Sequence, residues 1–193
     1  MPNQTWMQNV VSQRAAGTLY DAFTTAKTVI NQQDLYPFYP NYWQTGMRMR
    51  VRAAMAISNI VTTPGTITFQ IMFGSIVVWS SGAIQLNATA HTLLPALLEV
   101  ELVCQRANTG AAGVVAKFMG VGRLTGVMFT KTAAQTDGAN TETSIVVPVT
   151  APALGTAFDG TISQNLDFWA GFSISNGANE IQMADYSVDL SQP

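Results

Sequence analysis

The sequence predicts an all-β fold, an antiparallel β-sandwich of the jelly-roll type with an extended N-terminal arm. Several segments alternate apolar and polar residues with the period of two that a half-buried strand requires. Turn signals such as Ser175-Asn176-Gly177 separate these segments. Long connections at 80–92 and 150–163 favour a jelly roll over a meander, and over an up-and-down barrel, whose connections are short.

The first part of the chain divides into an arm, a short strand and an aromatic connector. Residues 1–23 show no sustained period, apart from a weak helical one over 8–14, and are interpreted as an arm before a single domain at 24–193. Residues 24–30 are rich in Thr, Val and Ile, which favour a strand. The connector at 35–43 contains five aromatic rings and two prolines. It is too apolar for a solvated loop, so it is expected to pack on a sheet or on a neighbouring subunit.

The clearest strand signal runs from Met47 to Ile57. The odd-numbered positions are apolar and are expected to face a core, whereas Arg48, Arg50 and Arg52 project from the opposite face. These three arginines are a third of the nine basic residues of the chain. The pattern therefore predicts a sheet with a concentrated row of guanidinium groups on one side.

Two interpretations of the arginine row stay open at this point. The row can form cross-strand ion pairs with Glu99 and Glu101, or with an acidic patch on another subunit, because the planar guanidinium binds carboxylates well. Alternatively, it can contact nucleic-acid phosphates. A net charge of −2 and the lack of further basic clusters favour pairing over nucleic-acid binding.

The remaining strands follow one another along the chain. They are expected at 66–73, 75–79, 93–106, 114–124, 143–149, 166–174 and 180–190. Pro95 indicates an edge or a bulge at the start of its strand, because proline has no N–H for a ladder. In the last strand the apolar parity changes after Met183, so a bulge near 184–185 is predicted to bring both apolar sets to one face. The polar segment 132–143, rich in Gly and Asn, is typical of a long mobile loop.

The composition favours a protein that assembles. Charged residues make up 10% of 193 positions, against about 25% in ordinary soluble proteins. A surface this poor in charge repels its own copies weakly and is prone to associate.

No apolar run approaches the ~20 residues of a membrane helix, and the N-terminus lacks the features of a signal peptide. Cys104 is the single cysteine and is expected to be buried, so no intrachain disulfide forms and assembly in the cytoplasm is expected.

Candidate catalytic groups are few. His91, the single histidine, is expected in a loop or at the surface, and no nucleophile motif accompanies it. Glu99 and Glu101 have a spacing compatible with a glycosidase pair, but no aromatic cleft marks them. The glycines of 120–126 lack the spacing of a phosphate loop and are interpreted as permitting bulges or close backbone approach. We therefore expect no enzymatic activity, no cofactor and no metal.

Three stretches resemble the jelly-roll virion proteins of tailed bacteriophages. They are Thr5-Trp6-Met7-Gln8-Asn9, the run from Arg50 to Phe69, and the closing part from Phe158 to Ser187. The resemblance covers most of the chain, and its motifs are structural. It implies incorporation into the virion, commonly as a homotrimer, and it transfers no catalytic residue.

The expected function is that of a non-enzymatic capsid decoration or minor capsid protein. Such a protein binds copies of itself and the major capsid protein or another virion protein, and stabilises the phage head without a nucleic-acid or membrane partner. The alternative is a receptor-binding or tail/head-fibre domain that recognises a host surface glycan through its loops, especially 132–143. The expected contact residues lie in the arm, the connector and the arginine strand: Trp6, Met7, Tyr36, Phe38, Tyr39, Tyr42, Trp43, Arg48, Arg50 and Arg52.

Overall fold

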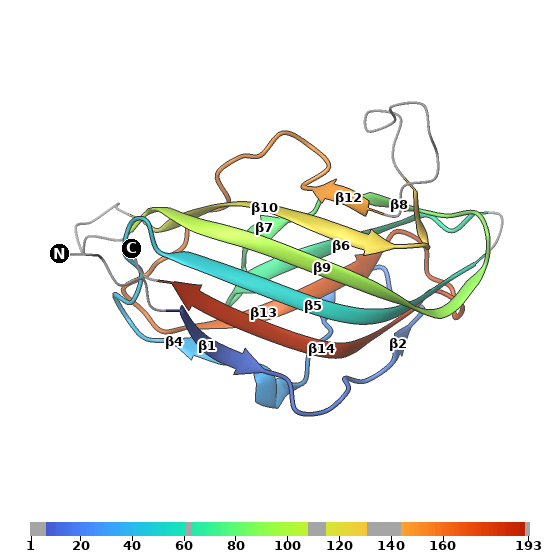
Figure 1. Cartoon of the computed structure of the whole chain (residues 1–193), viewed down its shortest axis with the longest axis horizontal. Coiled ribbons are helices and arrows are strands. Elements are labelled where there is room, and N and C mark those ends of the chain that lie inside the picture. Colours follow the sequence, from blue (N-terminus) through green and yellow to red (C-terminus); the bar gives the residue numbers. More distant parts are fainter. Residues whose placement is uncertain (1–6, 61–62, 108–114, 131–143, 192–193) are drawn as a thin grey trace.

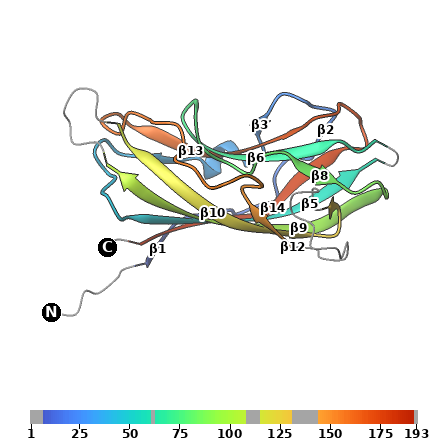
Figure 2. The same ribbon diagram turned by 90° about the horizontal axis from the view of Figure 1, so that it is seen from above.

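The structure is a computed structural model and describes residues 7–60, 63–107, 115–130 and 144–191. Two antiparallel sheets pack face to face along the length of the molecule (Figure 1, Figure 2). The predicted all-β sandwich is therefore confirmed. Within the described ranges, no helix has both the length and the apolar character needed to cross a membrane.

The described ranges form fourteen strands and one short 3-10 helix. In chain order these are β1 (Met7–Ser12), β2 (Tyr20–Asp21), β3 (Lys27–Thr28), η1 (Gln32–Asp34), β4 (Tyr36–Phe38), β5 (Arg48–Asn59), β6 (Thr66–Phe73), β7 (Ile76–Ser80), β8 (Ile84–Leu86), β9 (His91–Arg106), β10 (Lys117–Gly126), β11 (Phe129–Thr130), β12 (Ser144–Val147), β13 (Gln164–Phe172) and β14 (Glu180–Ser191).

The strands are divided between sheets that we call A and B. Sheet A has the order β1-β14-β5-β9-β10-β12, and β2 also pairs with β14. Sheet B has the order β11-β8-β6-β13-β3, with β4 on β13 and β7 on β6. As expected for a jelly roll, the end of the chain folds back on its earlier part, because β14 pairs with β5 and β13 pairs with β6. Strands β9 and β10 form a hairpin within sheet A.

The core lies between the two sheets and uses the alternate residues that the sequence pattern assigned to it. In β5, Met49, Val51 and Ala53 are fully buried, while the arginines between them are exposed. The inward faces of β6, β9, β13 and β14 alternate in the same way. Burial of these apolar side chains contributes about 25 cal/mol for each Å² removed from water, so the alternation determines which face of each strand turns inward.

The last strand contains the bulge that the sequence predicts. Its ladder to β5 shifts register between Met183 and Asp185. Because of this shift, Met183 before the bulge and Tyr186 after it both point into the core and are fully buried. Pro95 of β9 lies opposite Ala56 of β5. The ladder from β9 to β10 begins one residue later, at Ala96, so Pro95 lies at a local edge, as predicted.

Part of the predicted N-terminal arm belongs to sheet A. Residues 7–12 form β1 along one half of β14, and residues 20–21 form β2 along the other half. The weak helical period over 8–14 is wrong as a guide to structure, because pairing with the free edge of β14 overrides local propensity. Met7 is 73% exposed at the start of β1, and Trp6 lies outside the described residues.

The aromatic connector packs on its own chain. Phe38 and Trp43 are buried, with their ring centroids 4.7 Å apart. Trp43 also contacts Phe73 of sheet B and Phe118 of sheet A, at centroid distances of 5.6 and 4.7 Å. Phe38 and Trp43 are therefore core residues with no surface for a partner, which corrects their assignment as contact residues. Tyr39, in contrast, is 72% exposed.

The glycine-rich segment of β10 allows the close approach that the sequence predicts. A Cβ at Gly120 would lie 2.2 Å from Leu102 Cδ2 and 2.8 Å from Trp79 Cδ1. Trp79 Nε1 donates a hydrogen bond of 3.2 Å to the carbonyl oxygen of Gly120. Cys104 is buried beside this region, as expected, and burial raises the pKa of its thiol to about 11.

Candidate functional site

The outer face of sheet A, which points away from sheet B, holds the residues that alternate with the core positions. The ladders place these residues in rows that cross β14, β5 and β9. One such row consists of Asp189, Arg50 and Glu101. Figure 1 shows the three strands side by side along most of the sandwich. The row brings together charges from parts of the sequence that are far apart.

Three ion pairs join β5 to β9 on this face. Arg48 pairs with Glu101, Arg50 Nη2 lies 3.3 Å from Glu99 Oε1, and Arg52 Nε lies 3.7 Å from the same oxygen. The predicted cross-strand pairing of the arginine row is therefore confirmed within the chain. The five side chains are between 36% and 59% exposed. Water screens such pairs, so each one stabilises the fold by no more than about 1 kcal/mol.

The charge on the outer face alternates from strand to strand. Strand β14 contributes Asp185 and Asp189, and Asp189 accepts a hydrogen bond of 2.9 Å from Asn9 Nδ2 of β1. Strand β5 is positive and β9 is negative, as described above. On β10, Arg123 lies opposite Glu99 and donates a hydrogen bond to Ser144. Negative and positive stripes therefore follow one another across four strands.

Beyond the arginine row the outer face becomes apolar. Ala54 follows Arg52 along β5, and its row continues to Leu97 on β9. A shallow groove of about 690 Å³ lies over this end of the sheet. Its lining includes Ala54, Leu94, Pro95, Leu97, Val127 and Ala184. Val127 is 46% exposed, so this apolar surface is open to solvent in the single chain.

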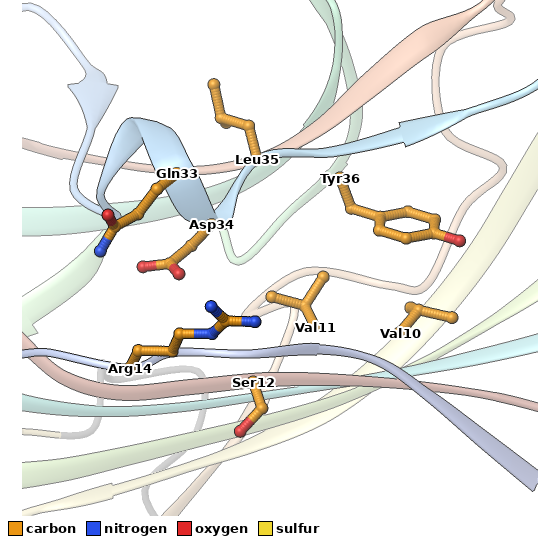
Figure 3. A pocket seen from close by; sticks show the side chains of 8 residues that line it. All are labelled: Val10, Val11, Ser12, Arg14, Gln33, Asp34, Leu35 and Tyr36. Carbon is orange, nitrogen blue, oxygen red and sulfur yellow. The ribbon is translucent and has the colours of Figure 1, made fainter.

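A second hollow, the edge cleft, lies where β1 of sheet A passes η1 and β4 (Figure 3). Its volume is about 240 Å³. It is lined by Val10, Val11, Ser12, Arg14, Gln33, Asp34, Leu35 and Tyr36. Figure 3 shows the Asp34 carboxylate and the Arg14 guanidinium projecting from opposite walls into the same space. Asp34 and Arg14 do not form an ion pair with each other. The ion pairs among the described residues lie on the outer face of sheet A.

The Asp34 carboxylate is held in place by the turn that contains it. Asp34 is 7% exposed, and its backbone N–H donates to the carbonyl oxygen of Asn31 at 2.9 Å. Asn31 Nδ2 donates to Asp34 Oδ2 at 3.3 Å and to the carbonyl oxygen of Ala15 at 3.2 Å.

The buried Tyr186 hydroxyl has no hydrogen-bond partner among the described residues. Burial raises the pKa of Tyr186, and the charges of Asp167 and Asp34 raise it further.

Sequence reasoning did not find the edge cleft. Arg14 belonged to the predicted arm, and Asp34 preceded the aromatic connector without any motif around it. The two residues meet because β1 pairs with β14 and so passes in front of η1. No spacing signal in the sequence predicts that the two residues meet, because their meeting depends on which strand β1 pairs with.

The candidate catalytic residues His91, Glu99 and Glu101 do not line the edge cleft. His91 begins β9 opposite Asn59, so the loop predicted for it is wrong, and its side chain is half-buried. Glu99 and Glu101 are engaged by arginines on an open face. The part of the chain that the structure describes has no group of three or more His, Cys, Asp or Glu side chains that could hold a metal ion.

The predicted contact residues do not form one surface. Met7 lies opposite Ser191, which lies opposite Arg48, so the start of β1 extends the arginine face. Tyr36 lines the edge cleft, and Tyr42 packs on Phe38 inside the connector at a centroid distance of 5.1 Å. Burial, with a smaller contribution from the Tyr36 charge, raises the pKa of the Tyr42 phenol. The glycan loop predicted at 132–143 lies outside the described residues.

The fold and its surfaces define a β-sandwich protein with a charged, partly apolar outer sheet face and a polar edge cleft. No protein-family model matches the chain, and no curated protein matches it. Among solved structures, the chain is similar to the CBM2 module of the evolved Dit of Lactobacillus casei BL23 phage J-1. The TM-score is 0.33 and the identity 11%, over 98% of each chain. A likeness this distant carries no conclusion about function.

Proposed function

We propose that the chain is a non-enzymatic structural protein of a bacteriophage particle, of the capsid decoration or minor capsid type, and that it assembles through the outer face of sheet A. The virion setting follows from the resemblance to jelly-roll virion proteins. The contact surface follows from geometry. The observation that supports this contact surface is the exposed apolar groove beside the arginine row.

The outer face has the composition of a protein interface. Interfaces combine an apolar centre with a polar, hydrated rim, and contiguous apolar surface is uncommon on a protein that stays alone. Here Ala54 and Leu97 lie in the apolar part, and the arginine and glutamate stripes lie beside it. The low overall charge of the chain adds little repulsion against such contact.

The partner that the charge pattern fits is a second copy of the chain. A twofold axis parallel to the strands and between β5 and β9 would set the arginine row of one copy opposite Glu99 and Glu101 of the other. The same operation would bring the two apolar grooves together. In the homotrimer that the resemblance implies, this face would instead meet a different surface of the next copy. Both assemblies bury Leu97.

Light scattering coupled to gel filtration tests the surface. The full chain is expected to elute as an oligomer, and Leu97→Glu as a monomer, because the new carboxylate would be buried in an apolar contact without a partner. Ile162→Glu is the matched control, since Ile162 is an exposed apolar residue before β13 with no place on this face. A monomeric parent protein, or a Leu97→Glu variant that stays oligomeric, would overturn the assignment of this face.

Electron cryomicroscopy of purified particles tests the virion setting. Density for this chain repeated over the capsid lattice is the expected result. Density confined to the tail tip would contradict a decoration role and favour the receptor-binding alternative. Absence of the chain from particles, established by mass spectrometry, would remove the virion role while leaving the oligomerisation result intact.

A further inference from the structure

We propose that the edge cleft between β1 and η1 binds a single neutral sugar ring of a glycan, with Asp34 and Arg14 as the recognising groups. The cleft is separate from the outer face of sheet A, so this proposal is independent of the assembly proposed above. It rests on the opposed charges in the cleft, on its apolar wall and on its size.

The two charged groups select for a neutral ligand that both donates and accepts hydrogen bonds. Asp34 offers carboxylate oxygens as acceptors, and Arg14 offers guanidinium N–H donors from the facing wall (Figure 3). A cation in the cleft would meet Arg14, and an anion would meet Asp34, so each is disfavoured by one wall. A vicinal diol satisfies both walls at once, because each hydroxyl donates to the carboxylate and accepts from the guanidinium.

Asp34 has acceptor capacity that the fold leaves unused. The residue is 7% exposed, yet the one side-chain donor that it receives among the described residues is Asn31 Nδ2, on Oδ2 at 3.3 Å. Asp34 Oδ1 accepts no side-chain hydrogen bond among the described residues, and it is not one of the fully buried atoms there that lack a partner, so it stays accessible from the cleft. The second contact of Asn31, to the carbonyl oxygen of Ala15 next to Arg14, ties the two walls together. The carboxylate is therefore held ready for donors from a ligand.

The rest of the lining suits the carbon face of a sugar ring. Tyr36 and Val10 lie near each other at one end of the cleft in Figure 3, and they form its apolar wall. Aromatic and aliphatic side chains pack against ring C–H groups, while a few polar groups set the orientation. A cleft of about 240 Å³ lies just below the range for drug-sized ligands, about 300–1,000 Å³. It suits one ring, with the rest of a glycan extending into solvent.

The test is saturation-transfer NMR on the full chain with D-glucose, D-galactose, N-acetyl-D-glucosamine and L-rhamnose, each offered singly at millimolar concentration. Transfer to at least one of them is expected. Asp34→Asn and Arg14→Gln are each expected to weaken binding about tenfold or more, because each removes a charged hydrogen-bond partner. Asp21→Asn and Arg106→Gln change exposed residues outside the cleft and are expected to bind as the parent does.

The outcomes separate a binding site from a structural role of Asp34. Near-ultraviolet circular dichroism of each variant shows whether the sandwich stays folded. If Asp34→Asn unfolds, Arg14→Gln carries the test, since Arg14 is exposed and has no ion pair among the described residues. Absence of transfer from all four sugars, or equal binding by the parent and Arg14→Gln, would overturn the proposal. A loss of sugar binding without any change in oligomeric mass would support it independently of the outer-face assembly.

Discussion

Arg50 and Glu99 are diagonal neighbours on β5 and β9. Arg50 lies opposite Glu101 in the ladder, yet its Nη2 is 3.3 Å from Glu99 Oε1. Arg52, directly opposite Glu99, approaches the same oxygen at 3.7 Å. One carboxylate therefore receives two guanidinium groups. Arg48 and Arg50 each reach the glutamate two residues from their ladder partner, whereas Arg52 pairs directly across. Glu99 is the acceptor on which the positive stripe of β5 depends most.

Replacing Glu99 by Gln is expected to lower the free energy of unfolding by no more than about 1 kcal/mol, because the pairs are exposed to water. The loss is expected to shrink in high salt, which screens the arginines from one another. Urea unfolding at low and high salt measures both effects. Glu101→Gln, which removes one pair instead of two, is the control. A salt-independent loss of several kcal/mol would contradict this account.

Trp43→Ala is expected to be among the most destabilising changes in the chain. The indole is 5% exposed and contacts rings from both sheets, so its removal leaves a cavity at the centre of the core. Large aromatic-to-alanine changes in cores cost about 3–5 kcal/mol. Tyr39→Ala, in the same connector but 72% exposed, is expected to change stability by no more than about 0.5 kcal/mol. Denaturant unfolding of both variants makes the comparison, and equal losses would show that the connector packs differently.

Gly120→Ala tests the close approach of β10 to its neighbours. The added Cβ would lie 2.2 Å from Leu102 Cδ2 and 2.8 Å from Trp79 Cδ1, so both side chains must shift inside a packed core. Overpacking of this kind costs about 1–3 kcal/mol. The matched control is Gly177→Ala, where a Cβ meets nothing within 4 Å. Thermal unfolding should rank the control at or above the parent protein and Gly120→Ala below it; the reverse order would refute the packing assignment.

Asp167 is expected to make stability fall as the pH rises from about 4. Burial raises the pKa of this carboxyl above its ordinary value, although hydrogen bonds from Thr28, Trp169 and the Phe168 backbone oppose the shift. Because the folded pKa is the higher one, the unfolded chain releases its proton first as the pH rises. The free energy of unfolding therefore decreases as the pH rises from the unfolded pKa to the folded pKa of Asp167, and it decreases no further from this cause at higher pH.

The corresponding measurement is the free energy of unfolding of the parent and of Asp167→Asn at several pH values between about 3 and 7. Asp167→Asn is less stable overall, because the amide nitrogen cannot accept the hydrogen bond from Trp169 Nε1 or another of the three donors. Its stability should nevertheless lack the decline that the parent shows above pH 4. A constant difference between the two proteins over the whole range would contradict the raised pKa.

Much of the sandwich was predictable from local patterns, and the reasons are specific. Apolar residues at every second position of β5 required one buried face. The parity change after Met183 required a bulge, and the ladder shifts register there. The pairing of the arginines with Glu99 and Glu101 was predictable because both sets lie on polar strand faces and are opposite in charge.

Other features depended on which segments became neighbours. The pattern of 35–43 predicted packing, but only the tertiary structure showed that Phe38 and Trp43 fill the core of their own chain. The strand expected at 24–30 is reduced to β3, because its contact with β13 is short.

Local sequence patterns were enough to predict the fold class, the strand faces and the charged row, since these depend on residues one or two positions apart. The pairing of β1 with β14, and with it the position of Arg14 across the edge cleft from Asp34, became evident only in the folded chain. Strand alternation specifies which side of a strand is apolar, and it carries no information about which strand lies beside it.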